Sequence, residues 1–278
     1  MTATDIPDSL STPGPAPTRP ARTKRSFATL RTILALMLRE MTTSYGRSPG
    51  GYMWAILEPA AGTALMTFIF SLGFRNPALG SDFPIFYASG LVPFFAYGAI
   101  SSKVGTAILY SKSLLVYPAV TYLDALLARF ILTAMTQMMV AYILFSFIIV
   151  VMDNAVSLTF GPILLGFGMA MALGLGIGTL NGFLFAVFPL WQQAWSILTR
   201  PLFIISGIFF LYDTIPEPYR GYLWYNPLVH VVGMSRSGFY ARYEAAYVSP
   251  VYVFAVAGIC FVVGLLFLHR YHRDILHN

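Results

Sequence analysis

The chain has little charge and almost no cysteine. Of its 278 residues, 10% are Asp, Glu, Lys or Arg, and one is cysteine. A soluble globular domain carries about 25% charged residues, so this sequence lacks the polar side chains needed to cover a water-exposed surface. The single cysteine, Cys260, excludes a disulfide-rich scaffold. An apolar content of 57% and a mean hydropathy of +0.70 exclude disorder. These figures indicate an integral membrane protein.

Long apolar runs account for most of this hydropathy. A helix needs about 20 apolar residues to cross a bilayer, and its backbone must satisfy its own hydrogen bonds there. No strand-like alternation competes over comparable lengths, which argues against a β-barrel. The sequence therefore predicts an all-α fold with six transmembrane helices, at about 53–73, 84–102, 128–151, 160–186, 194–212 and 249–268.

The distribution of basic residues predicts the orientation. The net charge is +6, but its basic residues form no continuous patch, so nucleic-acid binding is not expected. Cytoplasmic ends of membrane spans carry an excess of Lys and Arg. With both termini in the cytoplasm, 13 of the 17 basic residues lie on the cytoplasmic side of the membrane. The four on the outer side are Arg75, Arg220, Arg236 and Arg242. Both termini are therefore predicted to be cytoplasmic.

The region before the first span divides in two. Residues 1–26 are rich in proline and small polar residues, and we expect a disordered cytoplasmic tail there, followed by a membrane domain at 27–278. An amphipathic helix along the inner leaflet is predicted next, although packing against the bundle would give the same pattern. Its apolar residues recur every three or four positions: Phe27, Leu30, Leu34, Met37 and Met41.

The stretch between the last two spans, 213–249, is too apolar for an ordinary external loop. Asn226 followed by Pro227 is a good helix start, which predicts a helix to about Tyr240, and 216–225 can form a second short helix. We expect short periplasmic re-entrant helices here, before the last span.

Small residues recur at every fourth position of the fourth predicted span. Such a stripe lets another helix approach closely. Both packing within the chain and a dimer contact fit it, and packing within the chain is favoured. The stripe consists of Gly166, Ala170, Gly174, Gly178 and Gly182.

Catalytic motifs are missing. The sequence has no GxxxxGK[ST] loop, no HExxH, no GxSxG and no CxxC, and no paired carboxylates at one depth. We therefore expect no catalytic residue, no metal site and no cofactor in this chain, and any ATP must be bound elsewhere.

Ionisable residues within or near membrane spans are functional candidates. Glu58 precedes Pro59 in the first predicted span, and Arg200 precedes Pro201 in the fifth. Arg200 is predicted to face a cavity and contact an anionic substrate, or to pair with Glu58. Equally, its long side chain can reach the inner headgroups.

Three segments resemble a known family. RSPGGYMWAILEP at 47–59 resembles the motif opening the first span of polysaccharide-exporting ABC type-2 permeases. LLVYPAV at 114–120, with the Leu-Asp pair ending at Asp124, resembles their cytoplasmic coupling region, particularly in capsular polysaccharide exporters. YNPLVH at 225–230, with Arg236 and Tyr240, resembles the segment before their last span. The likeness covers roughly residues 27–273.

The resemblance implies a homodimer with two separate ATPase subunits, which bind ATP and Mg²⁺, in a bacterial inner membrane. It implies export of a lipid-linked capsular polysaccharide, with a periplasmic adaptor of the polysaccharide co-polymerase type and an outer-membrane channel as further partners. It also implies which residues transmit motion from the ATPase subunit: Ser111, Lys112, Leu114, Leu115, Tyr117, Pro118 and Asp124.

Aromatic residues, 16% of the chain, gather near the predicted outer face. An interfacial aromatic belt explains most of them, whereas some could line the exit and stack on sugar rings. Together with the charged residues above, the candidates for the substrate pathway are Glu58, Arg200, Tyr212, Trp224, Tyr225, Arg236 and Tyr240.

Other functions remain open. An O-antigen or teichoic acid exporter of the same permease group is the nearest alternative, and a drug or lipid permease is more distant. A membrane-bound glycan-modifying enzyme needs an acid–base pair, and a secondary transporter usually has repeated halves; the sequence offers neither.

Overall fold

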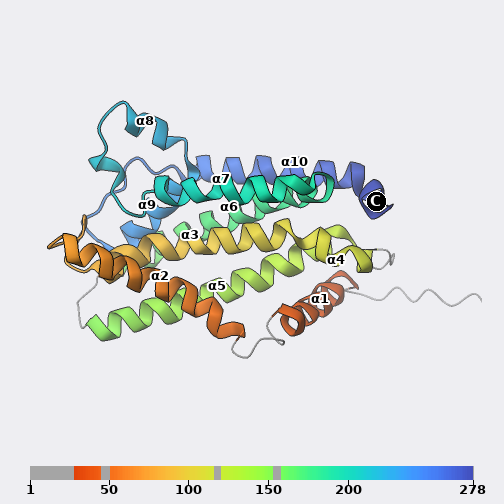
Figure 1. The fold of residues 1–278 in the computed structure, drawn as a ribbon, viewed down its shortest axis with the longest axis horizontal. Helices are drawn as coiled ribbons and strands as arrows, with labels where there is room; N and C mark the ends of the chain where they lie inside the picture. Colours follow the sequence, from red (N-terminus) through yellow and green to blue (C-terminus); the bar gives the residue numbers. More distant parts are fainter. Residues whose placement is uncertain (1–27, 45–50, 116–119, 153–157, 278) are drawn as a thin grey trace, which may run out of the picture.

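Within residues 28–44, 51–115, 120–152 and 158–277, which the computed structural model describes, every regular element is a helix. The predicted tail at 1–26, Phe27, Tyr117 and Pro118 lie outside the described residues. Long helices run along one another (Figure 1): α2 (Gly51–Gly73), α3 (Phe83–Gly105), α5 (Tyr122–Met152), α6 (Phe160–Val187), α7 (Pro189–Ile205) and α10 (Pro250–His277). Shorter helices lie at their ends: α1 (Ala28–Ser44), α4 (Ala107–Leu115), η1 (Tyr212–Thr214), α8 (Tyr219–Trp224) and α9 (Pro227–Phe239). The prediction of an all-α fold is confirmed.

Five helical stretches among the described residues are long and apolar enough to cross a membrane. They are Met53–Gly73, Phe83–Leu115, Tyr122–Val151, Phe160–Val187 and Pro250–Tyr271. The helix α7 is the predicted fifth span, but it has only 17 residues and begins and ends several residues before the predicted bounds. At 1.5 Å per residue it is about 25 Å long.

Helices α3 and α6 form the centre of the bundle. They pack against each other, and α5, α9 and α10 surround them. The small residues of α6 allow this approach: a Cβ atom built on Gly174 or Gly178 would lie 2.9 Å or 2.8 Å from the Cβ of Ile100 or Val104 on α3. The predicted stripe is therefore used for packing within the chain.

The two ends of the bundle carry different elements (Figure 1). Helices α1 and α4 and the last turns of α10 lie at one end, which we call the α1/α4 end. Helices α8 and α9 lie at the other, the α8/α9 end. The predicted Asn226–Pro227 helix start is confirmed, because the Asn226 side chain accepts a hydrogen bond from the Leu228 N–H at 3.1 Å.

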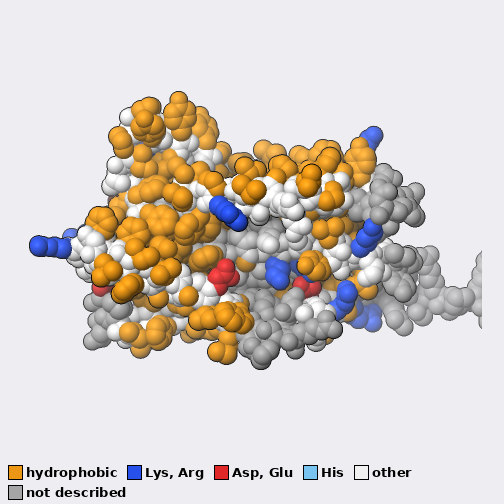
Figure 2. Space-filling model, in the orientation of Figure 1, with side chains coloured by type: hydrophobic (Ala, Val, Ile, Leu, Met, Phe, Trp, Pro, Cys, Tyr) orange, Lys and Arg blue, Asp and Glu red, His pale blue; other side chains and the backbone are white. Residues whose placement is uncertain are grey.

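Apolar side chains cover most of the surface in Figure 2, and most of the basic side chains visible there lie toward the α1/α4 end, with one at the opposite end. Large apolar residues such as Leu72, Leu190 and Val251 are more than 70% exposed. A surface of this kind suits lipid or other membrane helices rather than water.

Candidate functional site

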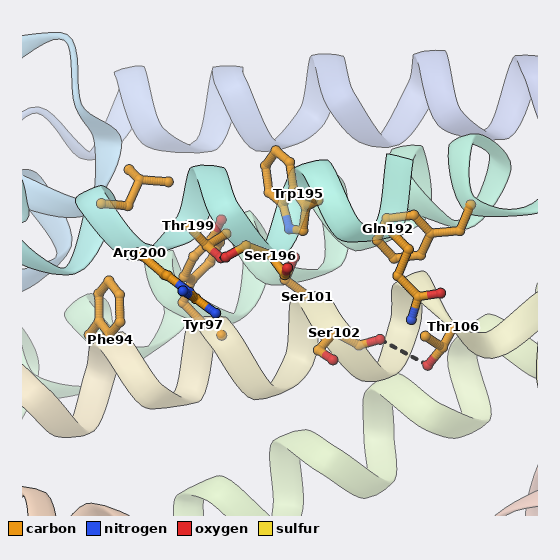
Figure 3. Close-up of a pocket in the computed structure, with 13 residues that line it drawn as sticks. Phe94, Tyr97, Ser101, Ser102, Thr106, Gln192, Trp195, Ser196, Thr199 and Arg200 are labelled. Atoms are coloured by element: carbon orange, nitrogen blue, oxygen red, sulfur yellow. Dashed lines mark hydrogen bonds between the residues drawn. The ribbon is translucent and has the colours of Figure 1, made fainter. Parts of the chain in front are cut away.

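An open cleft of about 340 Å³ lies between α3 and α7, and we call it the α3–α7 cleft. Figure 3 shows its side chains pointing from the two helices toward one another. It is lined by Phe94, Tyr97, Gly98, Ser101, Ser102, Thr106, Phe185, Gln192, Trp195, Ser196, Thr199, Arg200 and Leu202.

The cleft forms because each helix presents one consistent face. Its α7 residues recur at three- and four-residue intervals from Gln192 to Thr199, and those of α3 do so from Phe94 to Ser102. Residues at this spacing lie above one another on a helix. The opposite side of α7 carries apolar residues, of which Leu190 and Ile197 are 77% and 62% exposed.

Both ends of α7 are fixed by polar contacts. At its start, Pro189 stands in the first turn, and the Trp191 Nε1–H donates to Asn181 Oδ1 of α6 at 3.0 Å. At its end, Ser206 leads into Gly207, which has a φ of +76° that favours glycine. The Asn226 amide nitrogen donates to the Ile205 carbonyl at 3.1 Å, so the start of α9 holds the last turn of α7.

The lining of the cleft suits carbohydrate. Trp195 offers a half-buried ring on which a sugar face can stack, whereas Tyr97 is 3% exposed and only backs the cleft. The Ser102 hydroxyl can exchange hydrogen bonds with sugar hydroxyls, and the Thr199 hydroxyl, which donates to the Ser196 carbonyl at 3.1 Å, can accept one. Arg200 adds a permanent positive charge that matches carboxylate or phosphate groups. No lining residue is acidic. The cleft can therefore accept a neutral or anionic polar chain.

Arg200 lines this cleft, as the sequence predicted for a cavity-facing residue. Its guanidinium points toward α3 in Figure 3. Glu58 is exposed on α2, and among the described residues no ion pair joins it to Arg200. The structure thus brings Arg200, but not Glu58, to the cleft.

The predicted aromatic candidates lie apart from the cleft, at the α8/α9 end. The ring of Tyr212 stacks on Tyr247 with centroids 4.0 Å apart, and the Trp224 Nε1–H donates to the Tyr247 carbonyl at 3.1 Å. Tyr225 is 69% exposed. Burial raises the pKa of Tyr240 above its ordinary value, so its hydroxyl stays protonated. Three of these four rings pack against other parts of the protein. Of the four, only the Tyr225 ring is open to a ligand in a single copy of the chain.

Arg236 is buried and also lies away from the cleft. It is 2% exposed, its guanidinium stacks 4.1 Å from the Phe86 ring centroid, and it donates hydrogen bonds to the carbonyls of Gly207, Ile208 and Phe210. Desolvation lowers its pKa to about 10, which leaves it charged at neutral pH. In this position Arg236 fixes the loop that follows α7.

The predicted coupling region is partly helical. The nine-residue α4 carries Ser111, which is 7% exposed, and ends at Leu115, which packs against a buried cluster including Ile108 and Leu126. Lys112 and Leu114 are half-buried on the same helix. A partner could therefore reach α4 at the α1/α4 end.

Asp124 has a local structural contact. It is 4% exposed, and its Oδ2 accepts hydrogen bonds from the Thr121 N–H at 3.0 Å and the Thr121 hydroxyl at 2.8 Å. The Asp124 N–H donates in return to Thr121 Oγ1 at 3.2 Å. This reciprocal arrangement is a capping box at the start of α5.

No metal-binding cluster of three or more His, Cys, Asp or Glu side chains is present among the described residues. The candidate site is thus a polar, aromatic and basic cleft between α3 and α7. It offers binding groups and no catalytic constellation.

The family of the chain follows from its sequence matches. The ABC-2 type transporter family matches residues 31–240, which include α3, α7 and the whole cleft between them. The chain belongs to this family. With its five apolar helices, this ABC-2 type chain is a multi-pass membrane protein.

Several characterised relatives are similar to this ABC-2 type chain along most of its length. The polysialic acid transport protein KpsM of Escherichia coli is 34% identical over 246 residues, 88% of this chain and 95% of KpsM. The capsule polysaccharide export inner-membrane proteins CtrC of Neisseria meningitidis serogroup A and BexB of Haemophilus influenzae are 26% and 25% identical. Each match covers 88% of this chain and 92% of the relative.

The sequence interpretation missed most of the cleft. Ser196 and Thr199 stand at helical spacing within the predicted fifth span, with Gln192 one turn earlier and just before its predicted start, and this polar stripe was a usable signal. Ser101 and Ser102 gave no comparable signal, because they lie at the predicted end of the second span, where polar residues are expected.

Proposed function

We propose that this ABC-2 type chain is the transmembrane subunit of an ATP-driven exporter that moves lipid-linked capsular polysaccharide across the bacterial inner membrane. Its similarity to proteins named for capsule polysaccharide export and polysialic acid transport supports this function. The observation that carries the proposal is the α3–α7 cleft, whose aromatic, hydroxyl and arginine side chains suit an anionic glycan.

We infer that α7 is a sixth span. Its length of about 25 Å is close to the bilayer core of about 30 Å, and the segment 206–211 extends it at the α8/α9 end. Six spans return the chain to its starting side, in keeping with α1 and the last turns of α10 at one end (Figure 1). The excess of basic residues supports a cytoplasmic position for that end, in which case α1 would lie along the inner leaflet and α8 and α9 in the outer one.

A homodimer would resolve an energetic difficulty of the single copy. Arg200 is exposed in the open cleft, and an uncompensated arginine facing lipid is costly. None of the residues of α7 is buried. A second copy packed near α7 would close the cleft from lipid and leave a polar passage for the polymer.

ATP and Mg²⁺ would then be held by two separate ATPase subunits at the cytoplasmic side. Helix α4 is the natural contact, because it lies at that end and continues directly from α3, which lines the cleft. Movement of α4 would thereby reach the cleft. A periplasmic adaptor of the polysaccharide co-polymerase type and an outer-membrane channel would receive the polymer beyond the α8/α9 end.

Arg200 variants test this function in a capsule-forming strain lacking its own permease. We expect wild-type protein to restore surface capsule, Arg200→Lys to restore part of it, and Arg200→Ala to reduce it at least fivefold with polymer accumulating inside the cell. Arg242→Ala is the matched control, because Arg242 is exposed and lies outside the cleft. Wild-type export by Arg200→Ala would count against the proposed role of the cleft, and no export by the wild-type chain would count against the function.

A further inference from the structure

A second cavity, of about 460 Å³, lies at the α1/α4 end. It shares Ser102, Thr106 and Gln192 with the α3–α7 cleft, so the two cavities adjoin at these residues. We call it the basic cavity. Its lining consists of Arg39, Glu40, Thr43, Ser102, Lys103, Thr106, Tyr110, Ser111, Arg129 and Gln192.

Charge in the basic cavity is unbalanced. Arg129 is 7% exposed, and its charge is matched by Glu40, the only acidic residue of the lining, at 2.9 Å. Arg129 also donates to the Lys103 carbonyl at 3.3 Å and to Thr106 Oγ1 at 3.1 Å. The Arg39 and Lys103 side chains have no hydrogen-bond or ion-pair partner among the described residues. The cavity thus has two unmatched positive charges on a wall that Arg129 holds in place.

The depth of the cavity defines the environment of these charges. Arg39 lies on α1, whose Leu34 and Leu38 are 48% and 64% exposed, as expected for a helix with an apolar face in lipid. Lys103 lies in the last turn of the membrane helix α3. A helix that lies along the membrane surface and the last turn of a helix that crosses the membrane are both at the level of the lipid headgroups. Phosphate is the abundant anion at that level.

We propose that the basic cavity binds the phosphate of an anionic lipid headgroup, with Arg39 and Lys103 as its cationic ligands and the hydroxyl of Ser102 as a further donor. Ammonium, guanidinium and hydroxyl groups together match phosphate oxygens. The phosphate can come from a bilayer phospholipid or from the lipid anchor of the exported polymer, and the latter source rests on the proposed function. Because the cavity adjoins the cleft at Gln192, a headgroup bound here would bring attached sugars toward Gln192 and Trp195.

Native mass spectrometry of the delipidated full-length protein tests this site, with phosphatidylglycerol and phosphatidylcholine as probes. The double variant Arg39→Gln/Lys103→Gln should bind phosphatidylglycerol about tenfold more weakly than wild type, since interfacial cations attract anionic headgroups. The matched control Lys112→Gln/Arg270→Gln removes the same charge at the same end outside the cavity, and its binding should change less than twofold. Melting temperatures of both variants check that they fold.

The proposed site would be overturned if both double variants bound phosphatidylglycerol equally weakly, or if the cavity variant bound it as tightly as the wild type. Purified lipid-linked polymer, added as a competitor, distinguishes the two sources of the phosphate. If it displaces phosphatidylglycerol from the wild type but not from the cavity variant, the site binds the lipid anchor of the polymer. If it displaces none, the site binds bilayer phospholipid. Binding is measured without ATP or export. A chain that binds lipid here but exports no polymer therefore contradicts the proposed function alone.

Discussion

Arg129 and Glu40 join α5 to α1 through an ion pair whose nitrogen and oxygen lie 2.9 Å apart, with the two side chains 8% and 18% exposed. Arg129 also bonds the end of α3 and lies 4.8 Å from the ring centroid of Tyr110 on α4. One side chain therefore connects four helices at the α1/α4 end, including the predicted interface helix and the predicted coupling helix.

We expect Arg129→Ala to destabilise the protein by about 3 kcal/mol, because it removes a buried guanidinium that pairs with Glu40 and bonds the end of α3. Glu40→Gln should cost less, since Arg129 keeps its bonds to Lys103 and Thr106. Thermal unfolding in detergent measures both, with Arg242→Ala as an exposed control. A wild-type melting temperature for Arg129→Ala would contradict this role.

Arg236 should act through structure rather than through substrate. Lysine cannot form the forked hydrogen bonds that Arg236 donates to the loop after α7, so Arg236→Lys is expected to lose about 2 kcal/mol of stability and Arg236→Ala about 4 kcal/mol. Melting temperature and export should fall together. Loss of export in a variant with unchanged melting would instead support the substrate contact predicted from the sequence.

His230 makes stability depend on pH. Its ring is fully buried: Nδ1 accepts from the Ser249 N–H at 3.1 Å and Nε2 donates to the Trp224 carbonyl at 2.8 Å. Burial lowers the pKa of His230 below its ordinary 6.5. As pH falls below 6.5, the unfolded chain takes up this proton before the folded chain does, so stability is complete above that pH and decreases as the pH falls toward the lowered pKa.

The melting temperature should accordingly fall between pH 7.5 and pH 5. His230→Gln is expected to flatten this decrease, because it removes the titrating group. Identical slopes for the wild type and His230→Gln would show that another group titrates.

Trp195 tests the aromatic part of the cleft. Replacement by alanine removes a stacking surface and should slow export about fivefold with little change in dimer yield, whereas Trp195→Phe keeps a ring and should retain most of the rate. Tyr142→Ala is the control, because Tyr142 is 75% exposed on α5 and lies outside the cleft. Equal effects of Trp195→Ala and Tyr142→Ala would exclude a specific stacking role.

Local patterns predicted the helices well. Hydropathy located all six long helices, and Asn226–Pro227 located the start of α9, because both signals depend on neighbouring residues. The end of α7 was predicted at 212, whereas it lies at Ile205, since Gly207 takes a positive φ and α9 binds the last carbonyls.

The site was harder to predict than the fold. Arg236 lies 29 residues from Gly207 in the sequence, and no periodicity indicates that its guanidinium binds that carbonyl. In the same way, the polar stripe of α7 lines a cleft only because Tyr97, Ser101 and Ser102 of α3 line the opposite side. Contacts between distant segments set the function of such residues.

Chemical blocking of the cleft tests the central claim, that capsular polysaccharide passes between α3 and α7. Cys260 is the only cysteine of the chain, so a Cys260→Ser background leaves room for single labels. Ser196 lines the cleft and Ser71 lies outside it on α2; both are exposed, and each hydroxyl donates to the carbonyl three residues earlier, at 2.8 Å and 2.9 Å.

The measurement is ATP-dependent uptake of the polymer into inside-out proteoliposomes holding this chain and its ATPase partner, before and after labelling with a bulky maleimide. We predict that labelled Ser196→Cys loses at least nine-tenths of its uptake and that equally labelled Ser71→Cys keeps it. Undiminished uptake by fully labelled Ser196→Cys would contradict the account.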